Sequence, residues 1–152
     1  MLGAHQIELP HVHFPRKALA VDVSVRGAPL RFYSTHFDYG EDASAARAAA
    51  AAAILADLPA PGPAIVAGDL NAGPAEPGPA DLAAALVDLW PAANPSQTGA
   101  TMPAGKPTRR IDYLFASPSL GGKLLGAKLL DEHDGALWLS DHRGVAAAVL
   151  VP

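Results

Sequence analysis

The chain of 152 residues contains no cysteine. Disulfide bonds and thiolate chemistry are therefore excluded, and the sequence carries no indication of a redox compartment. Charged residues are also scarce, at 17% of the chain, and they leave a net charge of −4 and a pI near 5.8. A chain without a basic surplus is not expected to hold the nucleic-acid backbone tightly, although transient cleavage of nucleic acid stays open.

Long hydrophobic runs are missing as well. The longest, RAAAAAAILADL at residues 47–58, is mostly alanine and too short to cross a bilayer. The amino-terminal stretch MLGAHQIELPHVHFPRK lacks the continuous apolar core of a signal peptide. We therefore expect a cytoplasmic protein with no membrane partner.

Apolar residues, in contrast, are plentiful. They make up 50% of the chain, and 14 glycines and 15 prolines supply turn signals between the apolar segments. This is the composition of a globular protein rather than a disordered one, and the length suits one domain. We expect a single domain over residues 1–152.

Hydrophobic periodicity predicts six strands and two helices in mixed order. Residues 18–25 alternate, with Leu19, Val21, Val23 and Val25 on one face, as is typical of a half-buried strand. Helices are expected at residues 45–58, capped by Asp42 or Ser44, and at residues 79–90, which begin with a proline. The other expected segments are strands at 30–37, 64–68, 111–117, 123–130 and 144–151, and an irregular loop at 91–108. This mixture predicts an α/β layered domain.

Polar side chains recur at the ends of the predicted strands, where layered α/β proteins usually bind ligands. Asp69 and Asn71 alternate, so in an extended segment both would point to the same side. An aspartate after a glycine is, taken alone, more often a turn residue. The whole set offers hard oxygen ligands for a divalent cation, two imidazoles and a carboxylate to orient one of them, which suits hydrolysis of a phosphate ester. Its members are His36, Asp69, Asn71, Asp112, Asp141 and His142.

Four motifs in series carry a more specific resemblance. STHFD (34–38), IVAGDLNAGP (65–74), RRIDYLFASP (109–118) and LSDHRGV (139–145) are similar in order and spacing to the endonuclease/exonuclease/phosphatase superfamily. That superfamily includes deoxyribonucleases, abasic-site endonucleases, sphingomyelinases and inositol polyphosphate phosphatases. The resemblance implies an α+β-type layered sandwich, half of a four-layer αββα fold, with a mixed β-sheet and helices on its outer face.

The resemblance also implies catalytic roles. His36 would stabilise the phosphoryl oxygens, Asp69 would help to activate the attacking water or hold the metal, and Asn71 would donate a hydrogen bond to the phosphate. His142 would contact the scissile phosphate or transfer a proton, with Asp112 fixing its tautomer.

A bound Mg²⁺ or Mn²⁺ is implied in the same way, with Asp69, Asn71 and Asp141 as its ligands. Arg109 or Arg110 could add positive charge near the phosphate, or the two could simply be surface arginines.

The resemblance is limited to the carboxy-terminal half of the family domain. The other half ordinarily supplies an Asn and a Glu, the main metal ligand, and no such pattern precedes His36. Acids after His36, namely Asp38, Glu41 and Asp42, could substitute, or the chain could be an inactive fragment. Alternatively, two copies could associate. Half a sandwich would expose an apolar sheet face, so we expect a homodimer through that face.

The expected function is a divalent-metal-dependent phosphodiesterase that acts on small or generic phosphodiesters and forms no stable nucleic-acid complex. A nuclease acting on DNA or RNA, a phosphomonoesterase and an inactive truncated binding module are the alternatives. His11 and His13 could form a metal pair, but we expect an exposed edge strand there.

Overall fold

A mixed sheet of six strands forms the centre of the computed structural model, which describes residues 1–60, 62–135 and 137–151. The strand order is β1-β2-β3-β4-β6-β5, in which β3 and β4 are parallel and all other neighbours antiparallel. These strands are β1 (Gly3–Leu9), β2 (Arg16–Val25), β3 (Ala28–His36), β4 (Ala64–Asp69), β5 (Val87–Asp88) and β6 (Asp112–Ala116).

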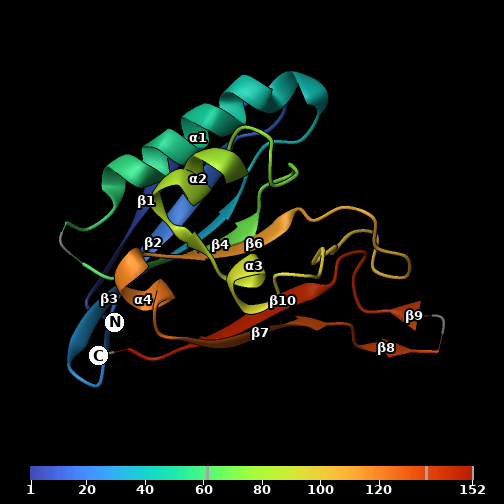
Figure 1. Cartoon of the computed structure of the whole chain (residues 1–152). Helices are drawn as coiled ribbons and strands as arrows, with labels where there is room; N and C mark the ends of the chain where they lie inside the picture. Colours follow the sequence, from blue (N-terminus) through green and yellow to red (C-terminus); the bar gives the residue numbers. More distant parts are fainter. Residues whose placement is uncertain (61, 136, 152) are drawn as a thin grey trace.

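Helices cover one face of this sheet. The long helix α1 (Ser44–Asp57), which follows the 3₁₀ turn η1 (Glu41–Ala43), lies beside α2 (Pro79–Ala85) on that face (Figure 1). Ala50, Ala51 and Ile54 of α1 are fully buried against the sheet. Small alanine side chains allow the helix to approach the strands closely, so the alanine-rich sequence serves both helix propensity and packing.

A second, smaller layer lies on the other side. The antiparallel pair β7 (Leu124–Leu130) and β10 (Gly144–Val149) packs against β6 and the short helix α3 (Leu89–Ala93) (Figure 1). The helix α4 (Pro118–Gly121) leads into β7, and the hairpin of β8 (His133–Asp134) and β9 (Leu137–Trp138) extends away from the body. The predicted α/β layered fold, with a mixed sheet and helices on its outer face, is confirmed.

Several local predictions were wrong. The helix expected over residues 79–90 ends at Ala85, because the backbone at Leu86 is extended and β5 then pairs with β6. The chain resumes a helix at α3, where the side chain of Asp88 caps the amide of Trp90. Neither Asp42 nor Ser44 caps α1 through its side chain.

The amino-terminal region also differs from expectation. Strand β1, absent from the predicted strands, forms the edge of the main sheet, whereas His11 and His13 lie outside it in a loop. His11 contacts the carbonyl oxygen of Leu9 through Nδ1, and His13 contacts Asp38. The expectation of an edge strand at the HVH segment is therefore wrong.

The two faces of β2 are covered unequally. Ala18 and Ala20 are buried under the helices, whereas Leu19 on the opposite face is 42% exposed. Although Val23 joins a second core cluster with β7 and β10, the apolar face predicted from the alternation remains partly open. The smaller layer contacts the β6 side of the sheet, so the β2–β3 part of this face has less cover.

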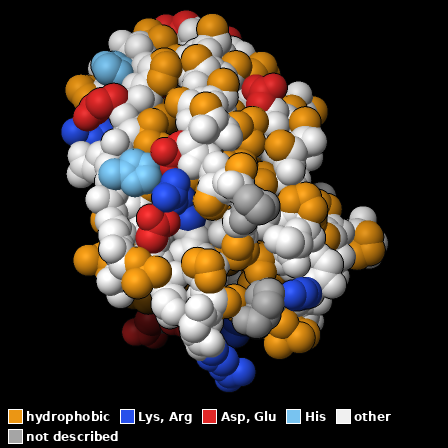
Figure 2. Space-filling view, turned by 90° about the vertical axis from the view of Figure 1, so that its left-hand side faces the viewer, with side chains coloured by type: hydrophobic (Ala, Val, Ile, Leu, Met, Phe, Trp, Pro, Cys, Tyr) orange, Lys and Arg blue, Asp and Glu red, His pale blue; other side chains and the backbone are white. Residues whose placement is uncertain are grey.

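Figure 2 views the side that carries both chain ends, where hydrophobic side chains cover much of the surface. Acidic, basic and histidine side chains gather along one edge of that view. Within the described residues, no helix combines the length and the apolar character needed to cross a membrane.

A buried carboxylate ties two loops together next to the end of β3. Asp38 is 1% exposed and accepts hydrogen bonds from the backbone amides of Val12, His13 and Tyr39. Burial raises the pKa of Asp38, but these amides and the nearby imidazole of His13 outweigh it and lower the pKa to about 2. The ionised carboxylate therefore stabilises the fold.

Replacing Asp38 with Asn should lower the free energy of unfolding by about 2 kcal/mol at neutral pH. The carboxylate has a lower pKa in the folded than in the unfolded chain, so its contribution is present above pH 3.8 and is lost as the pH falls toward 2. Urea unfolding of the wild type and of Asp38→Asn at several pH values would measure this. The free energy of unfolding should decrease less in the variant than in the wild type as the pH falls. Asp42→Asn, which alters an exposed carboxylate near the same His13, is the control. Equal stability of wild type and Asp38→Asn would contradict this role.

Candidate functional site

Three strands bring polar residues to one edge of the main sheet. In the sheet register His36 of β3 pairs with Asp69 of β4, and Asp69 pairs with Asp112 of β6. The ends of the parallel strands β3 and β4 thus meet the beginning of the antiparallel strand β6. The edge collects one imidazole and two carboxylates from residues far apart in the sequence.

The pairing of β3 and β4 at this edge depends on Gly68. A methyl group at Gly68 would overlap the backbone carbonyl oxygen of Thr35, one residue before His36. The absence of a side chain therefore allows the two strands to approach where His36 and Asp69 must lie side by side.

The GDLN segment is a turn and part of the site at once. Asn71 has a φ of 50°, and its amide donates to Asp69 Oδ1 at 2.8 Å. Its side-chain Nδ2 lies 3.0 Å from the carbonyl oxygen of Phe37 and 3.0 Å from His36 Nε2. The expectation of an extended segment through Asn71 is wrong, since β4 ends at Asp69 and the backbone at Asn71 is left-handed, a conformation that asparagine tolerates well. The turn nevertheless keeps both side chains beside His36.

His142 reaches the same edge from a loop. Its Nδ1 lies 2.9 Å from Asp112 Oδ2, the contact expected to fix its tautomer. Two backbone hydrogen bonds secure the loop on the segment before β6: Ala104 donates to the carbonyl of Asp141 at 2.7 Å, and Arg143 donates to that of Thr101 at 2.8 Å. The position of His142 therefore depends on the irregular segment 91–108 as well as on β6.

The environment alters the protonation of two of these groups. Burial raises the pKa of Asp69 and the neighbouring Asp112 charge adds to this, while the Asn71 amide opposes them. Burial lowers the pKa of His142, but the hydrogen bond to Asp112 and nearby carboxylates outweigh it, so the net direction is upward. Close negative charges with few cations between them are a favourable environment for a positive ion.

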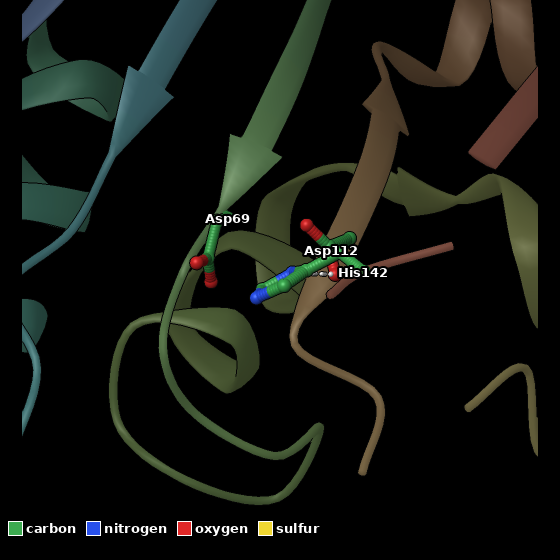
Figure 3. A group of neighbouring side chains, drawn as sticks. All are labelled: Asp69, Asp112 and His142. Atoms are coloured by element: carbon green, nitrogen blue, oxygen red, sulfur yellow. Dashed lines mark hydrogen bonds and ion pairs between the residues drawn. The ribbon is translucent and has the colours of Figure 1, made fainter. Parts of the chain in front are cut away.

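The donor set fits a divalent cation. Asp69, Asp112 and His142 each offer an atom, and these atoms lie within 4.8 Å of one another (Figure 3). Figure 3 shows the His142 ring between the two carboxylates, with its second nitrogen directed toward Asp69. Carboxylate oxygens are the ligands preferred by Mg²⁺ and suit Mn²⁺ as well. Asp141, predicted as a ligand, lies outside this group in an exposed loop, and Asn71 directs Nδ2 at Phe37 and His36.

Other polar residues proposed from the sequence have contacts elsewhere. Arg110 pairs with Asp88 through two hydrogen bonds of 3.0 and 2.7 Å and lies over the ring of Tyr113, so its charge is already compensated. Asp38 is held by loop amides, and Asp42 lies 3.5 Å from His13. None of these acids belongs to the cluster formed by the described residues at the sheet edge.

Two neighbours of the site were not foreseen. Arg143 lines a hollow of about 180 Å³ together with Asp69 and Asp112, and Trp138 lines another beside His142. Arg143 directly follows the SDH sequence, which was a usable signal, but nothing in the sequence placed Trp138 next to His142.

Comparison with known proteins relates the whole arrangement to one family. The profile described as Endonuclease/Exonuclease/phosphatase family matches residues 4–142. A solved endonuclease/exonuclease/phosphatase from Bacteroides vulgatus is 21% identical, with a TM-score of 0.83 over 99% of this chain and 66% of its own. One from Beutenbergia cavernae is 26% identical, with a TM-score of 0.78 over 97% and 44%. A mannosyl-6-phosphatase from Bacteroides thetaiotaomicron is 19% identical, with a TM-score of 0.83 over 99% and 67%.

No curated protein matches the sequence significantly. The chain spans between 44% and 67% of the length of the three solved structures, so each of them contains a substantial part with no counterpart here.

Gly68→Ala should destabilise the protein by about 2–3 kcal/mol and weaken the site, because the new methyl group must push β4 away from Thr35. Thermal unfolding and Mn²⁺ binding followed by electron paramagnetic resonance would measure the two effects. Gly126→Ala in β7 is the matched control, since nothing lies within 4 Å of its added methyl group. A Gly68→Ala protein with wild-type stability and Mn²⁺ affinity would show that the close approach is unimportant.

Proposed function

The chain belongs to the endonuclease/exonuclease/phosphatase family, and we propose that it is a divalent-metal-dependent phosphodiesterase. The observation that carries this proposal is the convergence of Asp69, Asp112 and His142, from β4, β6 and a loop, within 4.8 Å. The family fold supports phosphoester hydrolysis in general. That the substrate is a phosphodiester is part of our proposal.

The contacts of the two histidines support the roles proposed for them. Asp112 accepts the Nδ1 proton of His142, which leaves Nε2 to exchange a proton with an ester oxygen of the substrate. His36 is exposed at the same edge and lies beside Asp69 and Asn71, so its imidazole can bind a phosphoryl oxygen. Asn71 supports that imidazole in addition to its proposed hydrogen bond to the phosphate.

The cation would be held chiefly by the carboxylates of Asp69 and Asp112. Asp141 and Asn71 are kept as proposed additional ligands, because Asp141 is near enough to raise the pKa of His142 and Asn71 adjoins Asp69 in the turn. When bound, Mg²⁺ or Mn²⁺ supplies positive charge to the phosphate oxygens and favours ionisation of the attacking water. Asp69 would orient that water.

Small or generic phosphodiesters are the proposed substrates, since the net charge of −4 disfavours a long polyanion. Cleavage of DNA or RNA is the alternative within the same chemistry. A protein with this fold is named a mannosyl-6-phosphatase, so phosphomonoesters belong among the tested substrates. An inactive binding module is the non-enzymatic alternative.

A homodimer is proposed as the form in which the protein acts, with the open face around Leu19 covered by a second copy. That face is apolar at Leu19 and carries both charge signs at its β1 rim, where Lys17 pairs with Glu8 at 2.7 Å. In a symmetric dimer the same patch of both copies meets, so a surface that carries both charge signs beside an apolar centre can be complementary to itself.

Purified protein should hydrolyse bis(p-nitrophenyl) phosphate with Mn²⁺ and lose this activity in EDTA. His142→Ala should lower kcat/KM about a hundredfold or more, because the substituted protein lacks the group that exchanges the proton. Plasmid DNA and p-nitrophenyl phosphate, assayed in parallel, decide between the alternatives. His11→Ala, which removes an exposed imidazole from a loop, is the matched control and should retain full activity. Turnover that survives EDTA or His142→Ala would refute the assignment.

Light scattering should give a mass of twice the 15.5 kDa of one chain, and Leu19→Lys should reduce it to that of a monomer. The buried charge would be unpaired at the centre of the interface. Ala52→Lys, on the exposed side of α1, places the same charge on the opposite side of the molecule and should leave the dimer intact. A folded wild-type monomer at micromolar concentration would rule out the proposed dimer.

A further inference from the structure

An apolar hollow adjoins the candidate catalytic histidine. It has a volume of about 230 Å³ and is lined by residues at the end of β7, in β9 and in the loop that carries His142. Leu130, Trp138 and Leu139 supply its apolar walls, and Glu132, Ser140, His142 and Gly144 complete its boundary. The His142 side chain therefore adjoins both the carboxylates of Asp69 and Asp112 and the hollow.

The leucine walls of this hollow are open to solvent. Leu139 is 80% exposed and Leu130 is 39% exposed, although both could have been polar without disturbing a core. Their neighbour Leu137 is also exposed, at 69%, but does not line the hollow. Apolar side chains kept at the mouth of a hollow beside a polar site are characteristic of a ligand pocket.

The wall formed by Trp138 is held in place from several directions. The Arg143 guanidinium lies 5.1 Å from its ring, and the His133 imidazole lies at 4.6 Å. Arg143 is itself fixed, because its Nε donates to the carbonyl of Ala104 at 2.8 Å. The indole is therefore tied to the same loop contacts that position His142, so the hollow and the histidine keep a constant relation.

We propose that this hollow binds the apolar alcohol portion of the substrate, next to the phosphate held at His142 and the carboxylates. This inference rests on the proposed phosphoesterase function and adds the substrate class, phosphate esters of an apolar alcohol. A group that enters the hollow is removed from water by Leu130, Trp138 and Leu139. The resulting gain grows with the number of methylene groups buried, by up to about fourfold in affinity for each.

The test uses methyl-, butyl- and hexylphosphonate, whose carbon–phosphorus bond is not an ester, with Mn²⁺ present. Calorimetry should show at least a tenfold gain in affinity from the methyl to the hexyl compound. Longer chains should also change the fluorescence of Trp138, one of two tryptophans, since Trp90 is buried elsewhere.

Two leucines provide a matched pair of variants. Leu139→Ser should weaken the increase of phosphonate affinity with chain length, while the affinity for methylphosphonate should stay within about twofold of the wild type. Leu137→Ser makes the same change two residues away and should leave the dependence intact. Both side chains are largely exposed, so neither change should affect folding.

The results separate this inference from the proposed function, because binding is measured without turnover. A wild type that hydrolyses phosphodiesters but binds all three phosphonates equally would overturn the pocket and leave the activity standing. The proposed pocket would also be overturned if Leu137→Ser and Leu139→Ser weakened the dependence of affinity on chain length to the same extent. A chain-length dependence in a protein that hydrolyses no phosphate ester would support the pocket and refute the activity.

Discussion

The close approach of β3 and β4 is the constraint on which the site depends. Parallel pairing sets His36 beside Asp69, and it requires that residue 68 have no side chain, because the carbonyl of Thr35 occupies that space. Antiparallel pairing with β6 then adds Asp112 at the same edge. Once these three strands are in register, the carboxylate pair follows from backbone hydrogen bonding, and the surrounding loops have only to supply His142 and hold it against Asp112.

The sheet is covered unequally, and this affects how the protein is expected to work. Alanine-rich α1 packs closely on one face, while β7 and β10 cover the β6 side of the other and leave Leu19 partly exposed. Solved relatives contain a further part of the chain with no counterpart here. A second copy on the open face would bury this apolar surface and lie next to the same edge that carries the candidate metal ligands. Formation of the proposed dimer could then affect the proposed catalytic activity, because the dimer interface and the candidate site would lie on the same sheet.

Loop contacts join the site to its surroundings. The segment before β6 binds the loop of residues 140–143, which carries His142, through Ala104 and Thr101, and Arg143 of that loop lies over Trp138. A displacement of this segment would move His142 and the apolar wall together. The candidate metal site and the proposed pocket for the alcohol group are therefore expected to move together, although they derive from strands, a loop and a hairpin.

The sequence alone determined the layered α/β class, most strands and the residues of the sheet edge, because alternation, glycine and proline punctuation and the four motifs act locally. It could not decide where the helix after Pro79 ends, since β5 forms only by pairing with β6. Nor could it show that Asp112 rather than Asp141 joins Asp69 and His142, or that Trp138 lies beside His142. Those relations join residues distant in the chain, and only the strand register and loop packing of the tertiary structure place them together.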